Sequence, residues 1–409
     1  MRVAGRRPRV GILTPSLSRS VLIWPILGRT LATDSEVSMI LAPLSVLLLA
    51  VAPSVAAAQP ATAESPVALR WYRATPDVVE GKGWTDTGGD FDRFPARAKD
   101  DLRKPVWDLS QHSAGLSVQF VSDATRIRVR WTVTQDRLAL PHMPATGVSG
   151  LDLYANDGGT WYFVGGARPT ESPTNDAEVI VGLTRTPREF RLYLPLYNGV
   201  SRLEVGVPEE ATLRFVPSSK ARPVVVYGTS ITQGCCASRP GMSYTAMLGR
   251  RLDVPVINLG FSGNGKAEPE VARLLAELDP AIYVLDALPN LTPQQVDERM
   301  PAFIATIRAA RPRTPIVLVE HLLYPNLRFR TEKAADVATA NASLRRIYEE
   351  RRKAGDRHIT IVSSAMLLGT DGEGTVDDSH PTELGFARMV DGLEPHLRRL
   401  LPKPSQPKR

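Results

Sequence analysis

A serine and a histidine in the second half of the chain have the surroundings of a nucleophile and its base. Ser230 follows a glycine and a threonine directly after the β-branched run Val224–Tyr227, so its hydroxyl stands at the carboxyl end of a predicted buried strand. In open α/β sheets, ligands bind at that end. His380 lies in a polar loop, with the carboxylate of Asp377 three residues before it. Such a pair supplies a general base and the group that orients it.

Each of these residues also has a purely structural interpretation. Ser230 taken alone is more often a turn residue or a helix cap, and His380, which precedes a proline, could cap the last helix. Asp378 is an alternative to Asp377 as the orienting carboxylate. The order serine, aspartate, histidine is one that hydrolases use, but triads recur in several orders. The prediction of a nucleophile therefore depends on what the other strand ends supply.

Two further strand-like runs end in glycine or asparagine. One is Asn-Leu-Gly-Phe-Ser-Gly, which ends at Gly263, and the other is Leu-Asp-Ala-Leu-Pro-Asn, which ends at Asn290. Gly263 alone reads as a flexible turn. Asn290 begins an Asn-Leu-Thr sequon, where glycosylation is possible in an exported protein. Four segments that each carry a polar or flexible residue favour one shared site over four unrelated turns.

Together these segments resemble the four sequence blocks of the SGNH (GDSL-type) hydrolases, over residues 222–401. The resemblance implies that Ser230 is the nucleophile, His380 the base and Asp377 the orienting carboxylate. It also implies an oxyanion hole made by the backbone amides of Ser230 and Gly263 and the side-chain amide of Asn290. A glycan on that amide would destroy its donor role, so glycosylation is disfavoured.

The chain departs from the usual family pattern in two places. The aspartate of Gly-Asp-Ser is Thr229, and Gly-x-Asn-Asp is reduced to Leu288-Pro289-Asn290. A second resemblance lies upstream, in Gly-Leu-Asp-Leu-Tyr at 150–154 and Leu-Tyr-Leu-Pro-Leu-Tyr-Asn-Gly at 192–199. These motifs are similar to the β-rich domain that precedes the hydrolase in a two-domain bacterial branch, where the departures are ordinary.

The elements that must position these residues alternate between strands and helices after residue 223, which predicts a parallel sheet. The predicted strands are Val224–Tyr227, Val254–Asn258, Ile282–Asp286, Ile316–Glu320 and Ile359–Val362. A helix begins at Thr292, where a capping threonine is followed by proline and then glutamine. We expect a flavodoxin-like α/β/α hydrolase domain with helices on both faces of five parallel strands.

The region before it alternates apolar and polar residues between Gly/Asp/Asn/Pro turns, without a convincing helical stretch. This predicts an all-β, jelly-roll-like sandwich. It holds every tryptophan after the apolar N-terminal segment, and we expect most of them to pack in the core rather than to bind sugar. Arg93 and Asp152 are candidates to reach the catalytic cleft from this domain.

The N-terminus predicts export. Residues 39–58 form an apolar run that ends in small residues and contains two prolines, as in a signal peptide rather than a permanent membrane span. Cleavage after Ala58 would start the mature protein at Gln59. We divide the chain into a signal peptide at 1–58 with a possible misplaced upstream start, a linker at 59–67, the sandwich at 68–216, a linker at 217–222, the hydrolase domain at 223–402 and a basic tail at 403–409.

The charge balance excludes one class of partner. The formal net charge is +7, but six arginines against two acidic residues lie in the first 38 residues, which leaves +3 for all the rest. That remainder gives no reason to expect nucleic acid as a partner. The hydrophobic content of 43% and the charged content of 23% are those of a soluble globular protein.

The only two cysteines, Cys235 and Cys236, are adjacent. Neighbouring Cα atoms lie closer across a trans peptide than a relaxed disulfide requires. We therefore favour two small residues packed under the loop of Ser230, with a disulfide in an oxidising compartment as the alternative. No Cys/His spacing suggests zinc, and we expect no metal or cofactor. The remaining histidines are scattered singly: His112, His142, His321, His358 and His396.

These features predict an exported serine esterase that removes a small acyl group, with acetyl favoured, from a small-molecule or polysaccharide ester. The esterase prediction depends on the four motifs, whereas the carbohydrate prediction depends on the two-domain resemblance alone. One alternative is a lipase or thioesterase that acts on lipid acyl chains. Another is a carbohydrate-binding protein whose hydrolase half is a non-catalytic scaffold.

Overall fold

The computed structural model describes residues 67–402. The predicted signal peptide, its cleavage site and the basic tail lie outside the described residues. Within residues 67–402, no helix has both the length and the apolar character needed to cross a membrane.

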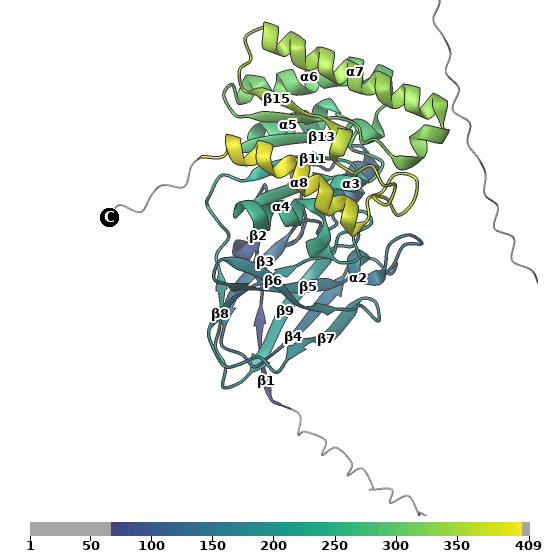
Figure 1. Cartoon of the computed structure of the whole chain (residues 1–409). Helices are drawn as coiled ribbons and strands as arrows, with labels where there is room; N and C mark the ends of the chain where they lie inside the picture. Colours follow the sequence, from purple (N-terminus) through teal and green to yellow (C-terminus); the bar gives the residue numbers. More distant parts are fainter. Residues whose placement is uncertain (1–66, 403–409) are drawn as a thin grey trace, which may run out of the picture. The chain divides into compact units, whose positions relative to one another are not determined.

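The N-terminal half forms two antiparallel sheets (Figure 1). The first sheet has four strands, in the order β1 (Leu69–Arg73), β9 (Val200–Pro208), β4 (Arg126–Val133) and β7 (Thr174–Val181). The second has the order β10 (Leu213–Val216), β3 (Ser117–Ser122), β8 (Arg188–Tyr193), β5 (Leu151–Asp157) and β6 (Thr160–Ala167), and β2 (Val79–Glu80) pairs with β3. The predicted all-β region is thus confirmed as antiparallel sheets.

Period-two alternation explains why these sheets pack face to face. Along β4 every second residue is buried, and its arginines point outward. The inward side chains Ile127, Val129 and Trp131 share one apolar core with Phe120 of β3 and Phe190 of β8. Two layers of strands therefore enclose a single core.

The C-terminal half contains a five-stranded parallel sheet. Its strand order is β12 (Val256–Gly260), β11 (Val224–Gly228), β13 (Ile282–Asp286), β14 (Ile316–Val319) and β15 (Ile359–Val362). In chain order this is 2-1-3-4-5, the flavodoxin-like arrangement. The predicted fold class is confirmed. All five strands are parallel, and the strand order reverses between β11 and β13. Ligands are therefore expected at the carboxyl end of β11.

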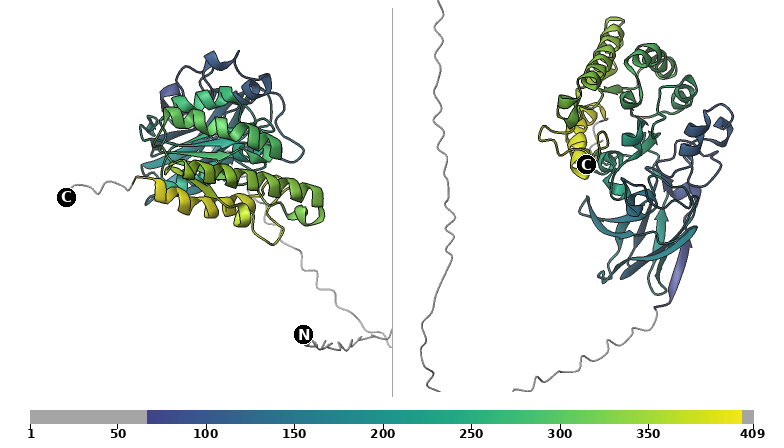
Figure 2. Two further views of the ribbon diagram at one scale, coloured as in Figure 1. Left: turned by 90° about the horizontal axis from the view of Figure 1, so that it is seen from above. Right: turned by 90° about the vertical axis from the view of Figure 1, so that its right-hand side faces the viewer.

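Helices cover both faces of this sheet, as the two views of Figure 2 show. Val224 and Val226 of β11 pack in one core with α4 (Tyr244–Leu252) and α8 (Glu383–Leu400). Val225 and Tyr227 face the opposite core. That core is covered by three helices: α5 (Pro269–Glu277), α6 (Pro293–Ala310) and α7 (Thr331–Lys353). The predicted capping box of α6 is present, because Thr292 accepts from Gln295 and the Gln295 side chain accepts in return.

The segment between β2 and β3 contributes Phe91 and Leu116 to the core of the sandwich, but much of it packs elsewhere. Its apolar side chains Trp84, Phe94 and Val106 pack in the same core as α5 and α6 of the parallel sheet. The expectation of no helix in this region is wrong at α1 (Lys104–Ser110), which begins with a proline in its first turn and buries Val106. This segment covers one face of the hydrolase domain.

Candidate active site

Ser230 is placed by the sharp turn that follows β11. It is the first residue of α3 (Ser230–Gln233), and the Thr229 side chain caps this short helix by accepting from the backbone N–H of Ile231 at 3.2 Å. Threonine is a competent helix cap, so the departure from aspartate at 229 keeps the local geometry. Gly228 is required at the end of the strand, because a Cβ there would collide with the Thr232 hydroxyl and the Asp286 carbonyl.

The structure brings Ser230, His380 and Asp377 together in series. The Ser230 hydroxyl lies 2.9 Å from Nε2 of His380, and Nδ1 of His380 lies 2.8 Å from Oδ2 of Asp377. The second oxygen of Asp377 accepts from the backbone N–H groups of Ser379 and His380 at 2.8 and 2.7 Å. These bonds fix the carboxylate against the imidazole, which is the arrangement that orients a general base.

The neighbouring carboxylate, Asp378, faces elsewhere. It forms an ion pair with Arg330 at 2.8 Å, so the geometry supports Asp377 rather than Asp378 beside the histidine. Burial by itself would raise the pKa of Asp377. The hydrogen bonds from the His380 ring and from two backbone N–H groups outweigh burial and lower this pKa to about 2. Asp377 is therefore ionised at neutral pH.

Gly263 and Asn290 both line a pocket of about 290 Å³. Gly263 has a φ of 67°, in the left-handed region that favours glycine. With its side-chain amide assigned the orientation that satisfies both ends, Asn290 accepts through Oδ1 from the backbone N–H groups of Asn264 and Gly265 at 3.1 and 3.2 Å, which ties this amide to the loop of Gly263. The two predicted oxyanion donors thus come from neighbouring loops that are bonded to each other.

The pocket beyond these donors is polar. Its lining includes His321, Lys333 and Asp336. Burial lowers the pKa of His321 to about 4, so its imidazole is neutral. The neighbouring Glu320 instead binds Arg345 and the backbone N–H of Ser364, which holds it away from the pocket.

Arg93 and Asp152 do not reach the cleft as catalytic groups, contrary to one expectation from the sequence. Arg93 is fully buried and donates to the backbone carbonyls of Asn258 and Gly260, at 3.1 and 2.8 Å, near the end of β12. Asp152 accepts from Arg239 at 2.6 Å and from the backbone N–H of Gly241 at 3.0 Å. Both side chains satisfy buried polar groups and so hold the loops that follow β12 and α3.

Replacing Asp152 by alanine is expected to lower the free energy of unfolding by about 3–5 kcal/mol, because it leaves Arg239 and a buried backbone N–H without their acceptor. Burial is the largest influence on Asp152 and raises its pKa, against the effect of Arg239. Urea-induced unfolding measures the change. Asp176→Ala, which breaks ion pairs on the outer face of β4, is the matched control and should cost below about 1 kcal/mol. An equal loss of unfolding free energy in both variants would contradict the role of Asp152 as the acceptor for Arg239 and a buried backbone N–H.

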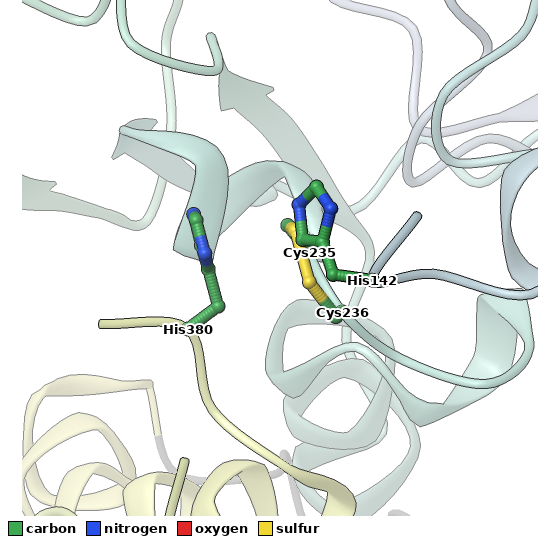
Figure 3. Close-up of side chains that lie close together, drawn as sticks. All are labelled: His142, Cys235, Cys236 and His380. Carbon is green, nitrogen blue, oxygen red and sulfur yellow. A yellow bond between two sulfur atoms is a disulfide. The ribbon is translucent and has the colours of Figure 1, made fainter. Parts of the chain in front are cut away.

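His142 was not among the predicted site residues. This residue lies in a loop between β4 and β5, yet its ring centroid is 5.5 Å from that of His380 (Figure 3). The loop is closed by mutual backbone bonds between Leu140 and Met143, and Met143 is buried against the hydrolase domain. No signal in the sequence shows that this loop reaches the active site, since the contact joins residues far apart in the chain.

The preference for free thiols at Cys235 and Cys236 is wrong, because the two residues form a disulfide in the structure. The peptide bond between the two cysteines is cis. The disulfide is buried next to α3, and the backbone N–H of Cys235 donates to the carbonyl of Ser230 at 2.9 Å. It therefore lies directly beside the candidate nucleophile.

A hydroxyl, an imidazole and a carboxylate in series at the end of the first strand of a doubly wound sheet define the class of serine hydrolases. The comparisons agree with this class. The GDSL-like lipase/acylhydrolase family model matches residues 221–398, and a model of the N-terminal domain of SGNH-hydrolase-type esterases, named GxDLY, matches residues 69–213. None of the curated proteins matches the chain significantly.

Solved structures extend the similarity over both halves. A protein described as a GDSL-like lipase from Bacteroides ovatus is 34% identical, with a TM-score of 0.78 over 81% of this chain and 98% of its own. The salicylyl-acyltransferase SsfX3 from a tetracycline biosynthetic pathway is 21% identical, with a TM-score of 0.67 over 81% and 97%. An acetyl xylan esterase from the rumen bacterium Butyrivibrio proteoclasticus is 12% identical, with a TM-score of 0.51 over 81% and 98%. The chain belongs to the GDSL-like lipase/acylhydrolase family and is an ester hydrolase.

Proposed function

We propose that this protein is an exported esterase that removes O-acetyl groups from carbohydrate. The observation that carries the catalytic part is the hydrogen-bonded series of Ser230, His380 and Asp377. The export part rests on the apolar run at 39–58, and a mature N-terminus at Gln59 would support it.

In this proposal His380 takes the proton of the Ser230 hydroxyl as the oxygen attacks the ester carbonyl. Asp377 keeps the imidazole in the required tautomer and stabilises the imidazolium. The oxyanion accepts hydrogen bonds from the backbone amides of Ser230 and Gly263 and from the Asn290 amide. His380 then gives its proton to the departing alcohol, and afterwards activates the water that hydrolyses the acyl-enzyme.

The polarity of the site favours a polar substrate over a lipid. The pocket beside Gly263 and Asn290 has a volume of about 290 Å³ and is lined by Lys333 and Asp336, which would be costly partners for a long acyl chain. An acetyl xylan esterase has the same fold over most of both chains, although this similarity supports the substrate only by analogy. A lipase or thioesterase that acts on lipid acyl chains is the alternative.

The test is hydrolysis of chromogenic esters from acetate to octanoate, followed by release of acetate from acetylated xylan oligosaccharides. We expect kcat/KM to be highest for acetate and to fall by about tenfold or more at octanoate, because a small polar pocket rejects added methylenes. Ser230→Ala is the control for uncatalysed and contaminating hydrolysis. A rise in kcat/KM with chain length would favour the lipid alternative. An absence of turnover by folded wild type would favour a carbohydrate-binding protein.

A further inference from the structure

Four side chains with metal-binding atoms meet next to the candidate nucleophile. One ligand atom from each of His142, Cys235, Cys236 and His380 lies within 4.8 Å of all the others (Figure 3). They come from three segments: the loop before β5, the loop after α3 and the loop before α8. Sequence spacing gave no sign of this cluster, and the expectation of no metal site considered spacing alone.

Two sulfurs and two imidazoles are a ligand set that suits zinc. With Zn–S bonds of about 2.3 Å and Zn–N bonds of about 2.0–2.1 Å, the ligand atoms of a tetrahedral site are separated by roughly 3.3–3.8 Å. The two sulfurs are bonded to each other and must move apart once their bond is reduced. All four ligand atoms otherwise lie within 4.8 Å of one another, so small movements of the side chains bring the set to these separations. His142 is exposed at the edge of the cluster, so its ring has room to turn toward the sulfurs.

Whether the two sulfurs can act as metal ligands depends on the redox state of the disulfide. Oxidised sulfurs are poor ligands, because the thiolate is the form that binds metal. We propose that reduction of the Cys235–Cys236 disulfide creates a site for a thiophilic divalent cation such as zinc, held by both cysteines, His142 and His380, and that occupation of this site switches the esterase off.

The steps balance with a dithiol as reductant. Thiol–disulfide exchange breaks the sulfur–sulfur bond of the protein and forms two thiols, while the dithiol is oxidised to its own disulfide. Zinc then replaces the protons of the two thiols, which are released to solvent, and accepts a lone pair from each imidazole. In the absence of metal, thiol–disulfide exchange with an oxidised dithiol re-forms the protein disulfide and reduces that reagent to its dithiol.

Inhibition follows from the bonds that His380 already makes. Nε2 of its ring lies 2.9 Å from the Ser230 hydroxyl, and Nδ1 lies 2.8 Å from Asp377. A metal on Nε2 occupies the lone pair that takes the serine proton. A metal on Nδ1 displaces the carboxylate that orients the ring. Capture of either nitrogen therefore removes one bond from the catalytic series.

The test uses the full-length protein, reduced with a phosphine that is then removed under anaerobic conditions. The phosphine becomes its oxide, with oxygen supplied by water. We expect reduced enzyme without metal to remain active, and a small molar excess of zinc to inhibit it by about tenfold or more. Oxidised enzyme should change by less than about twofold, and a chelator should restore activity. Cobalt should give thiolate-to-metal charge-transfer bands only in the reduced protein.

Two variants separate this site from other modes of inhibition. Cys235→Ser/Cys236→Ser should remain insensitive to zinc under reducing conditions. His142→Ala should weaken the inhibition by zinc by about tenfold or more. Loss of a metal ligand lowers the affinity for the metal at least as much as loss of a group that only hydrogen-bonds to a ligand. Equal inhibition of the oxidised enzyme or of the double serine variant would overturn the proposal, as would a reduced enzyme that binds no cobalt through sulfur. The inhibition rests on the proposed role of His380, whereas the cobalt spectrum does not depend on esterase activity.

Discussion

Ser230→Ala is expected to lower kcat/KM for a chromogenic acetate by about 10⁵- to 10⁶-fold, the scale of loss when the nucleophile of a serine hydrolase is removed. The reason is that alanine offers no atom that can form the acyl-enzyme, and the hydrogen bond to His380 disappears with the hydroxyl. Initial rates at several enzyme concentrations measure the loss. Covalent labelling by a fluorophosphonate should disappear in parallel.

The same variant should remain folded, because alanine fits the space of the small Ser230 side chain and only one part-buried hydrogen bond, to His380, is lost. Thr229→Ser is a matched control, since serine keeps the helix cap that precedes the nucleophile. It should unfold at the same urea concentration and keep its activity within about tenfold. Activity of Ser230→Ala within tenfold of wild type would show that another residue attacks the ester.

The local parts of the site could be predicted because each is defined by a short stretch of sequence. A buried strand followed by a tight turn places Ser230, and the loop from Asp377 to His380 carries its own orienting hydrogen bonds. The parallel sheet followed from the alternation of strands and helices, and its order places β11 between β12 and β13. Periodicity and turn chemistry act over a few residues, so the sequence displays them directly.

The contacts between the two halves could not be predicted, because they join residues that are far apart in the sequence. His142 comes to lie beside His380 across more than two hundred residues, and Arg93 supports β12 from a segment that sequence periodicity assigned to the sandwich. Trp84 shows the same difficulty: it was expected in the core of the sandwich and packs instead against the helices of the parallel sheet. The position of each of these side chains depends on packing between segments that are distant in the sequence. A local sequence pattern carries no information about such packing.

Asp377→Asn is expected to lower kcat/KM by about 10³-fold while leaving fluorophosphonate labelling slow but detectable. Removing the carboxylate of a fully buried triad costs about 10⁴-fold, because the imidazole then takes the wrong tautomer. The Asp377 side chain is 34% exposed, so water screens part of its effect on His380 and a smaller loss is expected. Asp378→Asn is the matched control. It removes a neighbouring carboxylate that pairs with Arg330, and its kcat/KM should stay within about twofold of wild type.

The contribution of Asp377 to the stability of the folded protein should depend on pH. Its pKa is lowered to about 2 in the folded protein, below the value of about 3.9 expected in the unfolded chain. The carboxylate therefore contributes stability that is fully present above about pH 4–5 and is lost as the pH falls toward 2. The contribution of the Asp377 carboxylate to the difference in urea midpoint between wild type and Asp377→Asn should be fully present at pH 5 and should shrink below about pH 4. A difference that instead grows on acidification would mean that Asp377 is protonated in the native state, and its role as the ionised partner of His380 would be untenable.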